Sequence, residues 1–221
     1  IEYPILLLSS ILGMFIMISS NDLMVFYLGL ELQSLALYVL ASFKRNDQLS
    51  SESGLKYFVL SALSSGLLLY GCSLIYGFSG STNFDQISNN ISEVQYGLTL
   101  GIVFILVGLA FKISAVPFHM WAPDVYQGSP TSVTIFFAIL PKIAALSVFI
   151  RFLYVPFINL IDQWQTIIIF VSIASMVFGA VAAIGQKNLK PLMDYSSISH
   201  MGFALAGLAV GTNEGIQSSI I

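Results

Sequence analysis

The chain has 221 residues, of which 57% are apolar and 9% charged, with a formal net charge of −3. A mean hydropathy of +0.88 is far above that of a soluble domain and predicts an integral membrane protein. The negative net charge does not indicate a nucleic-acid-binding surface, which would be rich in Lys and Arg. The single cysteine, Cys72, excludes an internal disulfide.

Apolar stretches long enough to form membrane helices recur along the chain, separated by short polar breaks. In chain order, the predicted spans cover residues 3–20, 23–43, 54–78, 97–127, 131–154, 163–185 and 191–211, and an eighth begins near residue 215. The longest polar loop is predicted over residues 79–96. The sequence therefore predicts an all-α, polytopic membrane helix bundle.

The fourth span contains the least usual sequence, which reads GLAFKISAVPFHMWAPDVYQGSP over residues 108–130. Lys112 interrupts its apolar run, and Pro117 follows five residues later. Proline removes a backbone hydrogen bond and clashes with the preceding turn, so we expect a broken helix near Pro117. A lysine deep in a membrane helix costs about 2.5–3.5 kcal/mol on insertion scales, and such residues often mark ion or proton paths.

Loop charges predict how the helices are oriented. Loop cations on the side where the chain begins are Lys44, Arg45, Lys187 and Lys190. Loop charges on the opposite side are Asp22, Asp85, Glu93, Arg151, Asp162 and Glu214. Because cytoplasmic loops carry an excess of lysine and arginine, the first side is expected to face the cytoplasm or the mitochondrial matrix.

Three charged residues fall well inside predicted spans, namely Glu31, Lys112 and Lys142. They belong to three different helices, so they can form one buried ionic chain only through tertiary packing. Burial and a second nearby cation both disfavour the charged form of a lysine in general, which permits proton release near neutral pH. The leading hypothesis is a proton relay, and the alternative is a static buried pair that fixes helix register.

Other features have simpler interpretations. Lys56, at the start of the third span, fits a boundary residue whose amine reaches the interface. His119 and His200, taken singly, fit ordinary core histidines. A weak internal repeat is also visible, because Gly13 and Gly179 each precede an apolar stretch that ends in an asparagine-containing turn.

Three segments are highly characteristic. They read DLMVFYLGLELQSLALYVLASFKR (22–45), GLAFKISAVPFHMWAPDVYQGSPT (108–131) and LKPLMDYSSISHMGF (189–203). They closely resemble the antiporter-like subunits of respiratory NADH:ubiquinone oxidoreductase (complex I), and within that family the subunit 2 branch nearest the quinone-reducing end. The likeness extends over nearly the whole chain. The wider family includes sodium/proton antiporter subunits and membrane-bound hydrogenases, which provide the alternative function.

The resemblance implies two inverted five-helix repeats, with residues 1–155 forming the first and residues 156–221 beginning the second. It also implies roles for individual residues. Glu31 would be the acid of the first repeat, paired with Lys56. Lys112 would be the lysine of the broken helix, and Lys142 would pass protons towards the central axis. His200 would be a polar relay residue of the next half-channel, with His119 as a further candidate.

The implied function is proton translocation coupled to quinone reduction elsewhere in the complex, without redox chemistry in this chain. NADH, FMN, iron–sulfur clusters and ubiquinone would be bound by partner subunits, and no cofactor by this chain. Expected partners are neighbouring antiporter-like and small membrane subunits, lipids and, if the second repeat is completed in trans, a separate chain. Spans rich in Ile, Phe and Ser favour the mitochondrial inner membrane, with the bacterial inner membrane as the alternative. A scaffold whose charges only hold helices together is a third interpretation.

Overall fold

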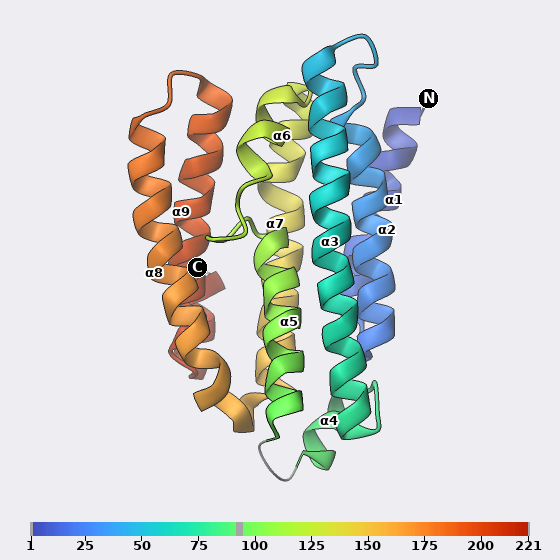
Figure 1. Ribbon diagram of the computed structural model, residues 1–221, viewed down its shortest axis with the longest axis vertical. Coiled ribbons are helices and arrows are strands. Elements are labelled where there is room, and N and C mark those ends of the chain that lie inside the picture. The colour runs from blue at the N-terminus through green and yellow to red at the C-terminus, as the bar shows by residue number, and fades with distance from the viewer. Residues whose placement is uncertain (1, 92–94, 221) are drawn as a thin grey trace.

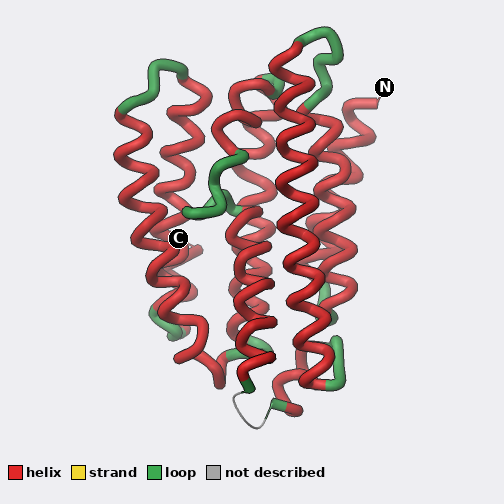
Figure 2. The backbone as a smooth tube through the Cα atoms, viewed as in Figure 1, coloured by secondary structure: helices red, strands yellow, loops and turns green. Residues whose placement is uncertain are grey.

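The computed structural model describes residues 2–91 and 95–220, and these residues form helices and no β-strand (Figures 1 and 2). In chain order the elements are α1 (Glu2–Ser19), α2 (Leu23–Ala41), α3 (Gln48–Ser79), α4 (Phe84–Asn90), α5 (Tyr96–Lys112), α6 (Ala122–Gly128), α7 (Thr131–Tyr154), the 3-10 turn η1 (Ile158–Leu160), α8 (Ile161–Ile184), α9 (Leu189–Ala209) and α10 (Asn213–Ile220). The predicted all-α membrane bundle is confirmed.

Five helical segments of the described chain are long and apolar enough to cross a membrane, and they comprise α1, α2, α3, α7, and η1 together with α8. Two further predicted spans differ from this pattern. Helix α5 has 17 residues and ends halfway along the bundle (Figure 1). Helix α9 has 21 residues but is less apolar along its length than these five segments.

Local capping explains where α3 differs from the prediction. The Asp47 side chain accepts a hydrogen bond from the backbone N–H of Leu49 at 3.1 Å and caps the helix there. Helix α3 therefore begins at Gln48, six residues before the predicted start, and Lys56 lies in its third turn. The predicted 79–96 loop contains the short helix α4, whereas Glu93 lies outside the described residues.

The first hairpin, α1 with α2, is closely packed through glycine. A Cβ added to Gly13 would lie 2.5 Å from the backbone nitrogen of Gln33 and 2.8 Å from the carbonyl oxygen of Gly29. Distances this short leave no space for a side chain, because backbone atoms cannot turn away as side-chain atoms do. Only glycine at position 13 permits the two helices to lie this close together.

The second hairpin, α8 with α9, repeats this contact. A Cβ added to Gly179 would lie 2.7 Å from the backbone nitrogen of Ser199 and 2.8 Å from the carbonyl oxygen of Tyr195. The contacted carbonyl oxygen and backbone nitrogen belong to residues that follow the glycine by 16 and 20 positions. The same two separations occur in the first hairpin. The two hairpins point in opposite directions in Figure 1. This supports an inverted repeat, although the division at residue 155 stays a prediction.

Gly13→Ala is expected to destabilise the bundle by about 1–3 kcal/mol, because the added methyl overpacks the α1–α2 contact. Gly66→Ala is the matched control, since a Cβ there meets no heavy atom within 4 Å. The control should be neutral or slightly stabilising. The measurement is the thermal stability of the purified membrane assembly. Equal stability of the two variants would show that the close approach is not required.

The loops predicted to lie on one side of the membrane are found at one end of the bundle. The α2–α3 and α8–α9 connections lie at the end where the chain begins, whereas α4 lies at the other end (Figure 1). An ion pair of 3.4 Å between Glu2 and Arg45 joins α1 to the α2–α3 loop at this end. Which end faces the cytoplasm stays a prediction.

Candidate functional site

The break in the fourth span begins at Lys112, five residues before Pro117. Ser114 has a positive φ of 59°, and the N–H of Ala115 donates to the carbonyl of Ala110 at 2.8 Å. The N–H of Ser114 also donates to the carbonyl of Phe111 at 3.1 Å. This pattern is a Schellman motif, which ends α5 at Lys112. The broken helix is confirmed, but the expectation that Pro117 ends it is corrected: a left-handed serine ends it first.

The break is fixed on both sides by hydrogen bonds. The indole Nε1 of Trp121 donates to the Phe111 carbonyl at 2.9 Å, which satisfies one of the free carbonyls at the end of α5. On the other side, the Val116 N–H donates to Ser175 Oγ of α8 at 2.9 Å. The chain re-enters a helix at Ala122. The end of α5 is therefore held rigidly in the middle of the bundle.

Lys112 is enclosed by hydroxyl groups of two neighbouring helices. Its side chain is buried, and Nζ donates to Ser34 Oγ of α2 and to Ser61 Oγ of α3, each at 2.7 Å. The Tyr38 hydroxyl donates to the same Ser61 Oγ at 2.7 Å. The amine also lies 6.0 and 5.9 Å from the ring centres of Tyr38 and Tyr57, where it is attracted to their faces. Within the described residues, Lys112 makes no ion pair.

Glu31 lies beside this cluster without contacting the amine. It precedes Ser34 by three residues on α2, so the two side chains share one face of the helix. Its Oε1 is buried and has no hydrogen-bond partner among the described residues. Ser34, which shares this helix face with Glu31, accepts a hydrogen bond from the Lys112 amine. The structure therefore brings Glu31 and Lys112 into one site.

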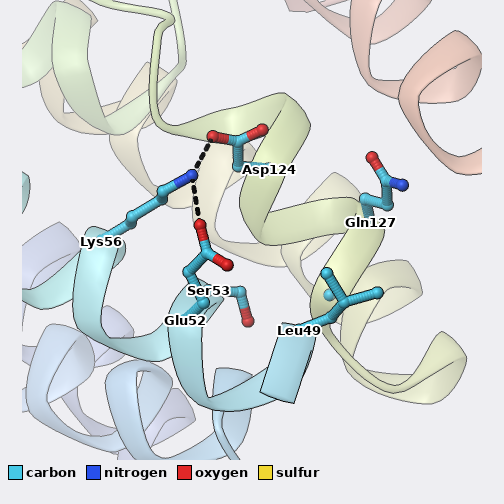
Figure 3. Close-up of a pocket in the computed structure, with 7 residues that line it drawn as sticks. Leu49, Glu52, Ser53, Lys56, Asp124 and Gln127 are labelled. Atoms are coloured by element: carbon cyan, nitrogen blue, oxygen red, sulfur yellow. Dashed lines mark hydrogen bonds and ion pairs between the residues drawn. The ribbon is translucent and has the colours of Figure 1, made fainter. Parts of the chain in front are cut away.

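The structure does not form the implied pair of Glu31 with Lys56, and that expectation is corrected. Lys56 Nζ instead pairs with Glu52 Oε1 and Asp124 Oδ2, each at 2.8 Å, at a small surface pocket (Figure 3). Its side chain is 42% exposed. The reason is the longer α3, which places Lys56 against the start of α6. Exposed pairs of this kind contribute little stability.

Lys142 forms a second buried site between α7 and α9. Its side chain is 3% exposed, and Nζ donates to Ser197 Oγ at 2.5 Å. The carboxylate oxygen Oδ1 of Asp194 lies 3.9 Å from the amine, and the ring centre of Tyr126 lies 5.4 Å away. The predicted burial of Lys142 is therefore present in the structure.

Asp194 is a buried acid that sequence reasoning missed, because its position near the start of the seventh span made it look like an end residue. Its side chain is fully buried. The feature of the sequence that could have identified Asp194 is its helical spacing from other buried residues of α9. These residues are Pro191, Ile198, Gly202 and Leu205. Asp194 lies on the same face as these residues.

The two histidines do not join either lysine site. His200 is exposed on α9, and no hydrogen bond or ion pair of the described chain joins it to Lys142 or Lys112. His119 is half-buried in the break, where its ring packs on that of Phe178 with centres 4.5 Å apart. The Nδ1 atom of His119 has no hydrogen-bond partner within the residues described. Relay roles for both histidines stay predictions.

Aromatic side chains occupy the region between the two lysines. Tyr57, beside Lys112, stacks on Trp121 with ring centres 4.5 Å apart. Phe137 contacts the rings of Tyr57 and Tyr126 at 5.7 and 6.5 Å. Tyr126 in turn lies beside Lys142. The two buried amines therefore border the two ends of one aromatic cluster.

A family model described as NADH:quinone oxidoreductase/Mrp antiporter, transmembrane, matches residues 20–221. The chain belongs to this antiporter family. Similar family members are NADH-quinone oxidoreductase subunit N of Pelagibacter ubique, 79% identical over the whole chain, and subunit N of Parvibaculum lavamentivorans, 59% identical. The chain covers 47% and 46% of these two proteins, so it spans about half the length of the relatives it matches.

Solved structures of family members have the same fold. Respiratory complex I from Thermus thermophilus contains a chain that is 36% identical, with a TM-score of 0.83 over 96% of this chain and 46% of its own. The Mrp complex of Dietzia contains one that is 25% identical, with a TM-score of 0.89 over 99% of this chain and 42% of its own. The antiporter-like architecture is therefore confirmed.

The relatives correct one expectation. The two most similar proteins described above are bacterial, so the mitochondrial inner membrane is not supported. Spans rich in Ile, Phe and Ser do not distinguish the two membranes, because a bacterial protein that is 79% identical shares most of this composition. The chain is a multi-pass membrane segment of the antiporter family.

Proposed function

We propose that this chain is part of a proton-translocating membrane subunit of a bacterial NADH:quinone oxidoreductase. The observation that carries the proposal is the 79% identity, over the whole chain, with subunit N of Pelagibacter ubique. Two lysines buried in the middle of the bundle supply groups that can carry the proton. The bacterial inner membrane is the corresponding location.

Glu31 and Lys112 perform the first transfer in this proposal. The neutral amine of Lys112 accepts a proton and later releases it. The hydroxyls of Ser34, Ser61 and Tyr38 can each donate and accept hydrogen bonds, so they can pass this proton to or from the amine. The position of Lys112 in the last turn of α5 assists the charged state, because the free carbonyls there carry partial negative charge. Glu31 is negatively charged when it has released its proton, and this charge alternates with the positive charge of Lys112.

Lys142 receives the proton from the Lys112 site. No direct hydrogen bond joins the two sites in the described part of the chain, and the aromatic cluster lies between them. Transfer therefore requires water or a movement of side chains in this region. Such a requirement is useful for a pump, because a permanently connected path would leak protons.

The energy would come from other subunits. In this proposal NADH, FMN, iron–sulfur clusters and quinone are bound there, and this chain contributes proton transfer alone. Neighbouring antiporter-like and small membrane subunits would cover its outer helices together with lipid. The rest of the second repeat would cover the exposed face of α9 that carries His200.

A sodium/proton antiporter subunit is the second candidate, because the chain of the Mrp complex superposes with a TM-score of 0.89. Its identity of 25% is far below the 79% shared with subunit N. Sequence similarity therefore favours the oxidoreductase.

The two candidates differ in what drives proton movement. When NADH is added to inverted membrane vesicles that contain the full-length subunit in its native assembly, the interior of the vesicles should acidify. This acidification should disappear when the subunit is deleted. Sodium alone should cause no proton exchange attributable to the subunit. Sodium-dependent exchange without NADH oxidation would favour the antiporter and contradict the proposal.

A further inference from the structure

The same carboxylate–serine–lysine arrangement occurs twice in this chain. On α2, Glu31 precedes Ser34 by three residues, and Ser34 Oγ accepts a hydrogen bond from buried Lys112. On α9, Asp194 precedes Ser197 by three residues, and Ser197 Oγ accepts a hydrogen bond from buried Lys142. In both cases the lysine comes from a different helix. Each buried amine is therefore presented with a hydroxyl and with a carboxylate one helical turn away.

The glycine contacts relate the two helices that carry these carboxylates. Gly29 of α2 and Tyr195 of α9 take equivalent places in the two hairpins. Glu31 lies two residues after the first of these positions, and Asp194 lies one residue before the second. The second carboxylate is thus displaced by about one turn along its helix and remains on the buried face. Asp194 is a displaced counterpart of Glu31.

The contact between Asp194 and Lys142 differs from a static ion pair. A charge-assisted N–H···O bond is about 2.7–2.9 Å long. Here the nearest carboxylate oxygen is 3.9 Å from Nζ, and the short hydrogen bond goes to Ser197 instead. Both oxygens of the buried Asp194 side chain have no hydrogen-bond partner in the described chain. A buried pair that serves only stability needs closer geometry and further hydrogen bonds.

We propose that Asp194 exchanges a proton with Lys142 and is the carboxylate of the second transfer site. In this step an N–H bond of the Lys142 ammonium breaks and an O–H bond forms on the Asp194 carboxylate. The products are a neutral amine and a neutral carboxyl group, so both buried charges disappear together and no other reactant is needed. The proton then leaves from Asp194, and Lys142 becomes free to receive the next one.

The geometry allows this exchange with a small movement. Lysine has four flexible side-chain bonds, so a change of rotamer can carry Nζ from Ser197 to Asp194. The Tyr126 hydroxyl is also buried without a partner within the described residues, and its ring lies next to Lys142. It is available to hydrogen-bond the neutral carboxyl group. Lys142 of α7 is thus the cation nearest Asp194 in the described chain, and Tyr126 of α6 lies beside that lysine.

The experiment measures NADH-driven proton pumping and NADH:quinone turnover in the assembled complex, normalised to the amount assembled. Asp194→Asn keeps the size of the side chain but cannot carry a proton, so both rates should fall by about tenfold or more. Asp194→Glu keeps the carboxyl group and should recover most of the loss. Asp162→Asn is the matched control, because it removes an exposed carboxylate at the start of α8 and should be without effect.

Normal pumping by assembled Asp194→Asn overturns the inference, and so does a failure of this variant to assemble, since that marks a structural acid. A second measurement does not depend on the Asn variant. Infrared difference spectra during turnover should contain a protonated-carboxyl band that shifts between the wild type and Asp194→Glu, and an unchanged band also overturns the inference.

The inference rests on the proposed function, and Lys142→Met separates the two. If Lys142→Met pumps normally, the proposed relay itself fails at this lysine. If Lys142→Met stops pumping while Asp194→Asn pumps normally, only the role of Asp194 is wrong.

Discussion

Lys112→Met is expected to reduce proton pumping and NADH:quinone turnover by about tenfold or more while the complex still assembles. Methionine fills a similar volume but cannot carry a proton. The hydroxyls that hold the amine keep other partners, because Ser34 Oγ donates to the Leu30 carbonyl and Ser61 Oγ accepts from Tyr38. The substitution therefore leaves no hydroxyl without a hydrogen bond. The measurement is pumping and turnover in purified, fully assembled complex.

Lys56→Met is the matched control for this prediction. It makes the same chemical change in a lysine whose side chain is 42% exposed and paired at the surface. Its effect on pumping should be small, because surface pairs contribute little and solvent replaces the lost contact. Equal loss of pumping in the two variants would contradict the assignment of Lys112 as the proton carrier.

Glu31→Gln is expected to impair pumping by about tenfold or more, because glutamine has the length of glutamate but cannot titrate. The buried Oε1 has no hydrogen-bond partner in the described residues, so the carboxylate is not holding the fold through that atom. Glu31→Asp should retain part of the activity, since it keeps the charge and shortens the reach. Turnover and proton uptake in inverted membrane vesicles would measure both.

Asp22→Asn provides the comparison for Glu31. The Asp22 side chain accepts hydrogen bonds from the backbone N–H groups of Met24 and Val25, at the start of α2. Asparagine caps helices about as well as aspartate, so little change in stability or pumping is expected. If Asp22→Asn and Glu31→Gln were equally harmful, depth in the bundle would not matter and the relay would be wrong.

Much of the fold could be predicted from the pattern of apolar stretches. The span 131–154 coincides with α7, because Pro130 marks the start of the helix and an apolar run continues to Tyr154. The apolar pattern does not mark the start of α3, because the first turns of this helix are polar and only the Asp47 cap reveals them. The end of α5 cannot be placed from the sequence, because the sequence does not show that Ser114 has a positive φ.

The site could be predicted only in part. Glu31, Lys112 and Lys142 stood out because a charge in an apolar run is locally conspicuous. The partners of these residues depend on tertiary packing, which no local pattern contains. The family resemblance, not a local pattern, implies the pair of Glu31 with Lys56, whereas Lys56 faces Asp124. Asp194, which faces Lys142, does not stand out because it lies near the end of its predicted span. The exposed position of His200 also depends on tertiary packing and could not be read from its span.

The most direct test of the central claim is the rate of NADH-driven proton pumping in assembled complex that carries Lys112→Arg. Arginine keeps the positive charge but does not release its proton in proteins, so a relay through Lys112 predicts that pumping fails. A structural cation at this position predicts the opposite, because arginine keeps the charge and can still donate hydrogen bonds to Ser34 and Ser61. Assembled Lys112→Arg complex that pumps at the wild-type rate would contradict the proton-carrier role of Lys112.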